Sequence, residues 1–343
     1  MAEPAPIDPR LLSLLACPRD HAPLQTDGHR LCCPHGHRYP VVDGIPVFLL
    51  PEAEQTIGLT AASLRAAQTR DGAPLFIDTV GVSEEERRGI QRDWRADAEV
   101  DAVISYLIGA TCGFGYLGQI GRLRRYPIPR VPLPRGEGRL MLDIGCSWGR
   151  WSVAAARKGW VPLGLDPSLG ALAASRRAFA GREQPMHRVC GDARYLPFRA
   201  DVFDAAFSYS VLQHFSEADA ETAFAEIGRV LARGGLAKIQ MAHAGGLRSR
   251  QIVRRPRDVA DAPFRVRYWS LERLRATFTR RIGPGRLSAE AFGGLGLLAD
   301  DWSLVSIKAK LLITASGFIR AIARIAPALI RLADSVYVDA VKR

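Results

Sequence analysis

At residues 142–149 the chain reads Leu-Asp-Ile-Gly-Cys-Ser-Trp-Gly. Residues 139–143 form a short apolar run that ends in an acid, which is typical of a buried strand. The glycines at 145 and 149 then mark a turn, and an alanine-rich helix is predicted from Trp151 to Gly159. A strand, a glycine turn and a helix in this order predict the first unit of an α/β sheet.

The same alternation continues through residues 138–243. Further strands are predicted at 161–165, 187–190, 203–209 and 236–241, and further helices at 168–181 and 220–232. Ser168 is a good N-cap for the first of these helices, and Gly234-Gly235 is expected to close the second. We therefore expect an α/β fold, with a mainly parallel sheet covered by helices on both faces.

Acids stand at three strand ends, where an open α/β sheet binds its ligands. Asp143 is placed to hold a cationic amino group, and Asp166 to accept both hydroxyls of a ribose. Asp192 is placed for an adenine amino group. Gly145 and Gly149 have no side chains, so backbone N–H groups in this turn can approach a carboxylate closely. A dinucleotide is disfavoured, because its site requires Gly-x-Gly-x-x-Gly.

Several segments occur here in the order found in one enzyme family. They read Leu-Asp-Ile-Gly-Cys-Ser-Trp-Gly, Gly-Leu-Asp-Pro-Ser, Gly-Asp-Ala-Arg-Tyr-Leu-Pro-Phe, Phe-Asp-Ala-Ala-Phe-Ser-Tyr-Ser-Val-Leu-Gln-His-Phe and Glu-Ile-Gly-Arg-Val-Leu-Ala-Arg-Gly-Gly. They resemble the Rossmann-like class I methyltransferases, in particular the methyltransferase type 11 group. One departure is Ser147, where the family often has glycine.

That resemblance implies S-adenosylmethionine (SAM) as methyl donor and a sheet that ends in an antiparallel hairpin. It implies cofactor contacts from Asp143, Gly145, Cys146, Ser147, Gly149, Asp166, Pro167, Asp192, Ala193 and Ser208.

The sulfonium of SAM already makes the methyl group electrophilic, so an enzyme must mainly position the acceptor and exclude water. A general base is needed only when the acceptor carries a weakly acidic proton. The candidates follow the fourth strand and are Tyr209, Gln213 and His214. His214 is the candidate base, because imidazole changes charge near neutral pH. The alternative is that His214 only shapes the pocket.

The N-terminal fifty residues contain closely spaced cysteines and histidines. The sequences Leu15-Ala-Cys-Pro-Arg-Asp-His21 and Leu31-Cys-Cys-Pro-His-Gly-His37 resemble the zinc-ribbon-like methyltransferase activator subunits and the N-terminal finger of ribosomal RNA guanine methyltransferases. The resemblance implies zinc ligands at Cys17, Cys33 and His37, with Asp20 or His21 in place of the missing cysteine. Cys32 and His35 offer a second register, and a metal-free ribbon is the alternative.

Two flanking segments suggest further contacts. Residues 104–125 include Tyr106, Phe114, Tyr116 and the glycines at 109, 113, 115 and 118, which suit either a lid over the site or an ordinary loop. Ile319, Ile322, Ile325, Leu329 and Leu332 recur at helical spacing, with arginines on another face. Such a helix packs on the protein or lies on an anionic membrane, and we favour packing. Pro327 should interrupt it.

The sequence thus predicts four regions: a zinc-ribbon-like module at 1–50, a helical linker or lid at 51–137, a SAM-binding domain at 138–310 and an amphipathic helical tail at 311–343. No apolar run is long enough to span a bilayer, and no secretory signal is seen, so a cytoplasmic location is expected.

The favoured function is methyl transfer from SAM to a small molecule, lipid or glycan. The net charge of +12 and the finger-like module keep RNA as an alternative acceptor. The third hypothesis is a non-catalytic protein that binds SAM as a scaffold or methyltransferase activator.

Overall fold

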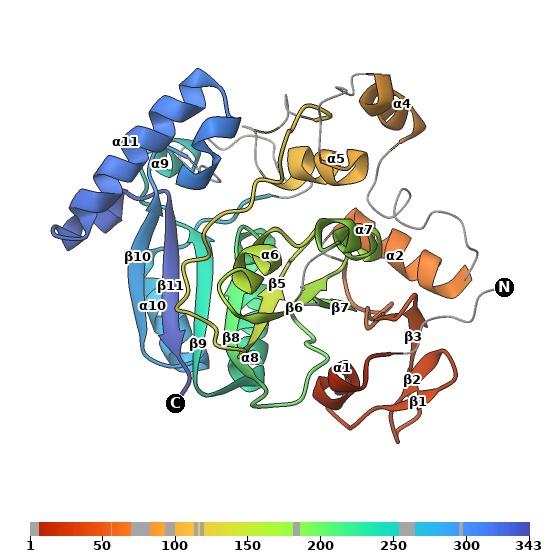
Figure 1. Cartoon of the computed structure of the whole chain (residues 1–343). Coiled ribbons are helices and arrows are strands. Elements are labelled where there is room, and N and C mark those ends of the chain that lie inside the picture. The colour runs from red at the N-terminus through yellow and green to blue at the C-terminus, as the bar shows by residue number, and fades with distance from the viewer. Residues whose placement is uncertain are drawn as a thin grey trace.

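The centre of the molecule is a seven-stranded sheet in the order β10-β11-β9-β8-β5-β6-β7 (Figure 1). The computed structural model describes residues 7–55, 57–69, 83–92, 100–112, 116, 120–180, 186–253, 265–294 and 298–343. The strands are β5 (Leu140–Ile144), β6 (Val161–Asp166), β7 (His187–Cys190), β8 (Phe203–Ser208), β9 (Leu231–Ala242), β10 (Gly285–Ala291) and β11 (Ser335–Val341). Neighbours among β5 to β9 pair in parallel, whereas β11 is antiparallel to β9 and β10. The predicted α/β sheet is confirmed.

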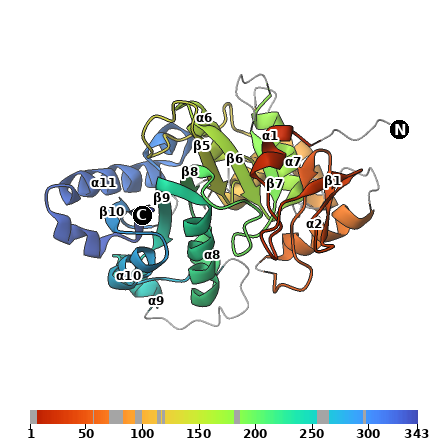
Figure 2. The same ribbon diagram turned by 90° about the horizontal axis from the view of Figure 1, so that it is seen from below.

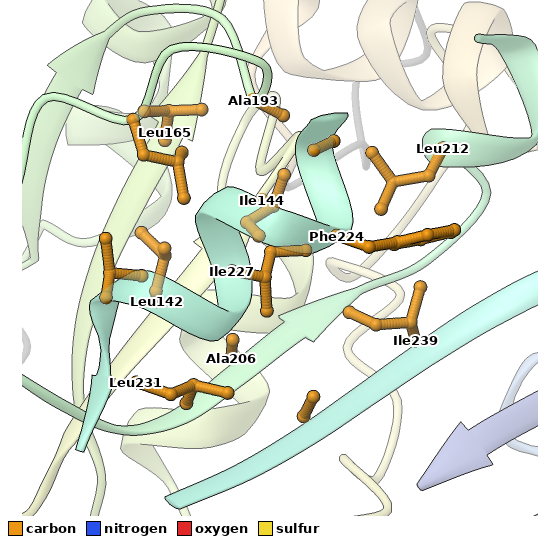
Figure 3. Packing of buried hydrophobic residues seen from close by; sticks show 14 of the residues in the cluster. Leu142, Ile144, Leu165, Ala193, Ala206, Leu212, Phe224, Ile227, Leu231 and Ile239 are labelled. Carbon is orange, nitrogen blue, oxygen red and sulfur yellow. The ribbon is translucent and has the colours of Figure 1, made fainter. Parts of the chain in front are cut away.

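Helices cover both faces of this sheet, which explains why β5 and β6 are apolar and buried almost throughout. On one face lie α6 (Arg150–Ala156) and α7 (Leu169–Ala178); on the other lie α8 (Glu217–Val230) and α10 (Leu271–Arg281) (Figure 2). Figure 3 shows the second layer from close by: Leu142, Ile144 and Leu165 of the sheet pack near Phe224 and Ile227 of α8. This core fixes the strand ends that carry the candidate site.

The predicted helix starts are more accurate than the predicted ends. Ser168 caps α7 as expected, because its Oγ accepts a hydrogen bond from the N–H of Ala171 at 3.2 Å. Helix α8 ends at Val230 and passes directly into β9, so the prediction that Gly234-Gly235 closes it is wrong. The glycines instead lie within β9, where the pairing with β8 shifts register. A Cβ on Gly235 would lie 3.0 Å from the carbonyl oxygen of Phe203, so the close approach favours glycine there.

The N-terminal module (residues 9–50) contains α1 (Pro9–Leu14) and a four-stranded antiparallel sheet of β1 (Gln25–Asp27), β2 (Arg30–Cys32), β3 (Arg38–Val42) and β4 (Ile45–Pro46). It lies beside the β7 edge of the large sheet (Figures 1 and 2). Leu15 forms a β-bridge with Phe198, and Val47 forms one with Cys190. The N–H of Phe48 also donates to the carbonyl of Cys190 at 2.7 Å. The module therefore covers an edge that would otherwise expose unpaired backbone groups.

The linker region has the expected helical character where it is described. Its helices are α2 (Gly58–Thr69), α4 (Glu84–Arg92) and α5 (Ala102–Thr111). Helix α5 contacts α7, so this region covers part of the large α/β sheet domain. Of the lid residues predicted above, Phe114 and the glycines at 113, 115 and 118 lie outside the described residues.

The C-terminal region differs from the uniform helical tail predicted for 311–343. Before residue 311 the chain forms α9 (Ser249–Val253) and η3 (Ala299–Leu304). Within 311–343 it forms the greater part of α11 (Ile307–Ala323) and η4 (Pro327–Leu332), but residues 335–341 form β11 inside the sheet. Helix α11 ends before Pro327, and η4 begins at this residue. Proline has no N–H to continue a helix but is tolerated at a helix start. None of the helices within the described ranges combines the length and apolar character that crossing a bilayer requires.

Candidate active site

The turn between β5 and α6 has three residues in the left-handed region. Gly145, Ser147 and Gly149 have φ angles of 73°, 47° and 88°. A Cβ on Gly145 would lie 2.2 Å from a methyl carbon of Val211, in the loop after β8. The N–H of Gly145 donates to the carbonyl of Leu165, at the end of β6, at 2.8 Å. The turn is therefore packed tightly against the ends of both neighbouring strands, and Gly145 is the residue type its shape requires.

Asp143 and Asp166 stand at the ends of adjacent strands and are both buried. Ser152 Oγ donates to Asp143 Oδ2 at 2.6 Å. Asp166 accepts from the backbone N–H groups of Ser147 and Ser168, each at 2.8 Å. Burial raises the pKa of Asp143 to about 7 and that of Asp166 to about 6. Two carboxylates thus converge on the turn, as the sequence predicts, and their burial favours a cationic or hydrogen-bonding ligand.

The third predicted acid has a different partner. Asp192 holds Arg194, whose Nη2 lies 2.7 Å from Asp192 Oδ2 and whose Nη1 lies 2.9 Å from Asp219 Oδ1. Ala193 is buried in the core. In this structure the carboxylate of Asp192 therefore orders its own loop through Arg194, and the predicted contact to adenine stays a prediction. The Asp-x-Arg spacing is the signal in the sequence that could have indicated this pair.

Cys146, Pro167 and Ser208, also predicted as cofactor residues, lie at the ends of β5, β6 and β8. Cys146 and Ser208 are buried, and Ser208 Oγ donates to the carbonyl of Ile144 at 3.1 Å, which joins the ends of β8 and β5. The carbonyl of Pro167 lies 3.6 Å from the thiol of Cys190.

The three catalytic candidates after β8 point in different directions. Tyr209 donates through its hydroxyl to Glu290 Oε1 at 3.0 Å. Gln213 lies in η2 (Leu212–His214), is buried and hydrogen-bonds to Ser210. His214 Nδ1 lies 3.3 Å from the backbone carbonyl of Arg265. Tyr209 is therefore hydrogen-bonded directly to another ionisable side chain, whereas Gln213 is buried and bonded to a neighbouring serine.

Glu290 lies at the end of β10 and was not predicted from the sequence. It is 2% exposed, and its Oε2 has no hydrogen-bond partner among the described residues. Burial raises its pKa. It lines a cavity of about 1190 Å³ together with Trp151 and Tyr337. Because Trp151 also stacks on Tyr209 with ring centroids 4.8 Å apart, the cavity begins next to the first residue after β8.

The lining of this cavity is rich in cations. It includes the side chains of Arg130, Lys238, Arg275, Arg320, Arg324 and Arg331, against three acids, Glu272, Glu290 and Asp300. The excess of positive charge favours an anionic group on whatever binds there. No local motif marks these residues, because they come from six separate parts of the chain.

Arg150, the first residue of α6, joins the site to the linker region. It is buried, its Nη2 lies 2.7 Å from Asp301 Oδ1, and its Nε donates to the carbonyl of Pro127 at 2.8 Å. The guanidinium also lies 5.6 Å from the ring centroid of Tyr116. The start of α6 is therefore fixed to two segments far away in the sequence, and the sequence analysis missed this connection.

The predicted metal ligands come together in the N-terminal module. One ligand atom from each of Cys17, Asp20, Cys33 and His37 lies within 4.8 Å of the other three. Sulfur, imidazole and carboxylate are all zinc ligands, and a tetrahedral zinc with bonds of about 2.0 to 2.3 Å fits a set of this size after small side-chain shifts. The donor set therefore fits zinc.

Two of the predicted ligands are in hydrogen-bond contact with side chains outside the cluster. Tyr39 hydroxyl lies 3.1 Å from Cys17 Sγ, and His35 Nδ1 lies 2.7 Å from Asp20 Oδ2. Such outer contacts orient ligands. Of the two registers in the sequence, the structure brings Cys33 and His37 into the cluster, while Cys32 Sγ points to Asp27.

Known protein families match both the large sheet domain and the N-terminal module. The family model described as "Methyltransferase domain" matches residues 141–235, and that described as "Trm112p-like protein" matches residues 8–44. A UPF0434 protein from Vesicomyosocius okutanii is 48% identical over 50 residues, which are 14% of this chain and 85% of that protein. The chain thus contains a methyltransferase domain, matched over residues 141–235, and a Trm112p-like module at residues 8–44.

Other relatives of this methyltransferase have varied names. The tRNA (carboxymethyluridine(34)-5-O)-methyltransferase alkbh8 of Xenopus tropicalis is 30% identical over 128 residues, 36% of this chain and 19% of that protein. A demethylmenaquinone methyltransferase of Mycobacterium marinum is 35% identical over 119 residues, 35% of this chain and 47% of that protein. The chain therefore spans less than half the length of these two relatives.

Proposed function

We propose that this methyltransferase binds SAM at the β5–α6 turn and transfers the methyl group to a small-molecule, lipid or glycan acceptor held in the cavity next to Trp151. One observation carries this proposal. Tyr209 directly follows β8, stacks on Trp151 and hydrogen-bonds to Glu290, and both of these partners line the cavity. The cavity thus begins where a bound methyl donor would end.

The binding roles follow from the positions of the carboxylates. Asp143 would hold the amino group of the methionine part, and the backbone N–H groups between Gly145 and Gly149 its carboxylate. Asp166 would accept the ribose hydroxyls. The hydrogen bonds that Asp166 accepts from the N–H groups of Ser147 and Ser168 hold its carboxylate next to the β5–α6 turn.

When bound, SAM would supply an electrophilic methyl group: the acceptor's lone pair would bond to the methyl carbon while the electrons of the C–S bond stay on sulfur. A hydroxyl or ammonium acceptor also loses a proton. Glu290 is a buried carboxylate that lines the cavity and accepts a hydrogen bond from the hydroxyl of Tyr209, so we assign Glu290 as the proton acceptor and His214 as the competing candidate. The cationic lining suits an acceptor that carries an anionic group.

We further propose that the Trm112p-like module holds one zinc ion through Cys17, Asp20, Cys33 and His37. Its bridges to Cys190 and Phe198 fix both ends of the segment that contains Asp192. A metal at this cluster would be structural, because the four ligands lie in the segment between the two bridging residues, Leu15 and Val47.

RNA is the second candidate acceptor. It is favoured by the name of the Xenopus relative and by the net charge of +12. An RNA acceptor predicts binding that weakens steeply with salt, because phosphate contacts release counterions.

The deciding experiment is acceptor screening with methyl-labelled SAM on cell extracts separated into small-molecule, lipid and RNA fractions. We expect label in the small-molecule or lipid fraction, accumulating about 100-fold or more slowly with the Glu290→Gln variant. Label confined to the RNA fraction would select the second candidate. Binding of SAM without transfer to any fraction would indicate a non-catalytic scaffold.

A further inference from the structure

Helix α11 packs on the protein through one face only. Ala309, Ile313 and Ser316 are buried, and Ser316 Oγ accepts from the N–H of Phe292 at 2.9 Å. This face also contacts η3 and β10. Of the apolar residues predicted at 319–332, Ile319 and Leu332 pack against the core, whereas Ile325 is 86% exposed, so the packing favoured in the sequence analysis holds for part of that set.

The opposite face carries large apolar side chains that are exposed. Ile307, Leu311 and Phe318 are 70%, 67% and 69% exposed, and Ile325, just beyond the helix, is 86% exposed. At 100° per residue these four positions fall within a sector of about 40°. They form one line along the helix, which we call the apolar stripe. A continuous line of this kind indicates a surface that binds something.

The charge around the stripe is of one sign. Residues 302–333 contain five cations, Lys308, Lys310, Arg320, Arg324 and Arg331, and no acid. Lys310 Nζ lies 4.7 Å from the ring centroid of Trp302, whose indole is partly exposed. An apolar line beside cations and an indole is typical of a helix that lies in a membrane interface.

We propose that α11 binds the surface of an anionic lipid bilayer, with the apolar stripe inserted at the headgroup boundary and the lysines paired with lipid phosphates. A second copy of the chain fits less well, because a symmetric contact through the stripe would bring together the four lysines that flank it, Lys308 and Lys310 of both copies. RNA would satisfy the cations but would leave the stripe exposed.

The position of α11 suits this role. It lies at the far side of the molecule from the N-terminal module (Figures 1 and 2), so neither the module nor β7 would meet the bilayer first. The side chains of Arg320, Ala323 and Arg324 line the cavity described above. These three side chains lie on the face of α11 opposite the stripe, so binding would place the cavity about one helix diameter, roughly 10 Å, from the bilayer surface. The nearness of the cavity rests on the proposed function; the membrane contact itself does not.

The test is co-sedimentation of the full chain with vesicles. We compare phosphatidylcholine vesicles with vesicles in which a quarter of the lipid is phosphatidylglycerol. The wild type should bind the anionic vesicles and lose binding in high salt. Phe318→Ser should bind at least about tenfold more weakly, because an aromatic side chain no longer inserts. Val341→Ser removes another half-exposed apolar side chain, at the end of β11, and should bind like the wild type.

Three results would overturn the proposal. The first is no binding to anionic vesicles by the wild type. The second is equal loss of binding in Phe318→Ser and Val341→Ser. The third is a concentration-dependent dimer that Phe318→Ser converts to a monomer, without vesicle binding, which would assign the stripe to a second copy. SAM affinity, measured by calorimetry on the same samples, shows that each variant is folded, and its failure in the wild type would concern the proposed function alone.

Discussion

Single residues set how the site responds to pH. The pKa of Asp143 is raised to about 7 and that of Asp166 to about 6, in both cases chiefly by burial. An acid whose pKa is raised on folding binds a proton more tightly in the folded state. Its contribution to the stability of the ligand-free protein is therefore complete below about pH 4 and is lost as the pH rises towards 7.

The same shift predicts how SAM binding depends on pH. A cationic amino group and ribose hydroxyls bind the ionised carboxylates, so SAM affinity should rise between pH 5.5 and 8 and binding near pH 6 should release protons. Calorimetry in two buffers of different ionisation enthalpy measures that release. Asp143→Asn should bind at least about tenfold more weakly at pH 8. A wild-type affinity that does not change across this range would contradict the roles of both acids.

Glu290 can be tested without removing the hydrogen bond to Tyr209. Glu290→Gln keeps an oxygen that accepts from the Tyr209 hydroxyl but cannot take a proton. We expect turnover to fall about 100-fold or more, the usual contribution of a general base, with SAM affinity unchanged. His214→Ala is the comparison. If His214→Ala loses turnover and Glu290→Gln does not, the base is His214 instead.

At the scale of elements, the start of α6 depends on one buried ion pair. Arg150→Met leaves the buried carboxylate of Asp301 without its cation and should lower the free energy of unfolding by about 3 to 5 kcal/mol. The neighbouring pair of Arg130 and Asp300 provides the control, because Arg130 is 88% exposed. Arg130→Met should cost less than about 1 kcal/mol. Equal losses in urea denaturation would show that the pair of Arg150 is not special.

Adjacent cysteines provide a matched test of the N-terminal module. Cys33→Ser removes a proposed zinc ligand, whereas Cys32→Ser changes a thiol that points to Asp27 outside the cluster. We expect about one equivalent of zinc in the wild type and in Cys32→Ser, and a loss of metal and of melting temperature in Cys33→Ser. Less than about 0.2 equivalents in the wild type would refute a structural zinc site.

The elements predicted correctly are those with local signals. Ser168 marks a helix start through its own hydroxyl, and the turn around Gly145 is visible because its shape excludes other residues. Errors arose where distant contacts decide. The Gly234-Gly235 pair resembles a helix end but serves the close approach of two strands. Residues 335–341 continue a basic apolar segment and become a strand because β9 and β10 are there to pair with them.

At the scale of the whole molecule, the candidate site divides in the same way. The part proposed to bind SAM, with Asp143 and Asp166 next to a glycine turn, was predictable because its residues lie in two short segments, at the ends of β5 and β6. The acceptor side was not, because Glu290 meets Tyr209 across 81 positions and Arg150 meets Asp301 across 151. Across the molecule, the Trm112p-like module is followed by the large sheet and then by α11 (Figure 1). The cavity lies next to α11.

The most direct measurement is calorimetric titration of the pure, folded protein with SAM and with S-adenosylhomocysteine. The account predicts saturable binding of both at one site per chain, weakened in Asp143→Asn and unchanged in Phe318→Ser. No association with either compound, from protein whose unfolding is cooperative, would contradict the claim that the carboxylates at the β5 and β6 ends form a SAM site.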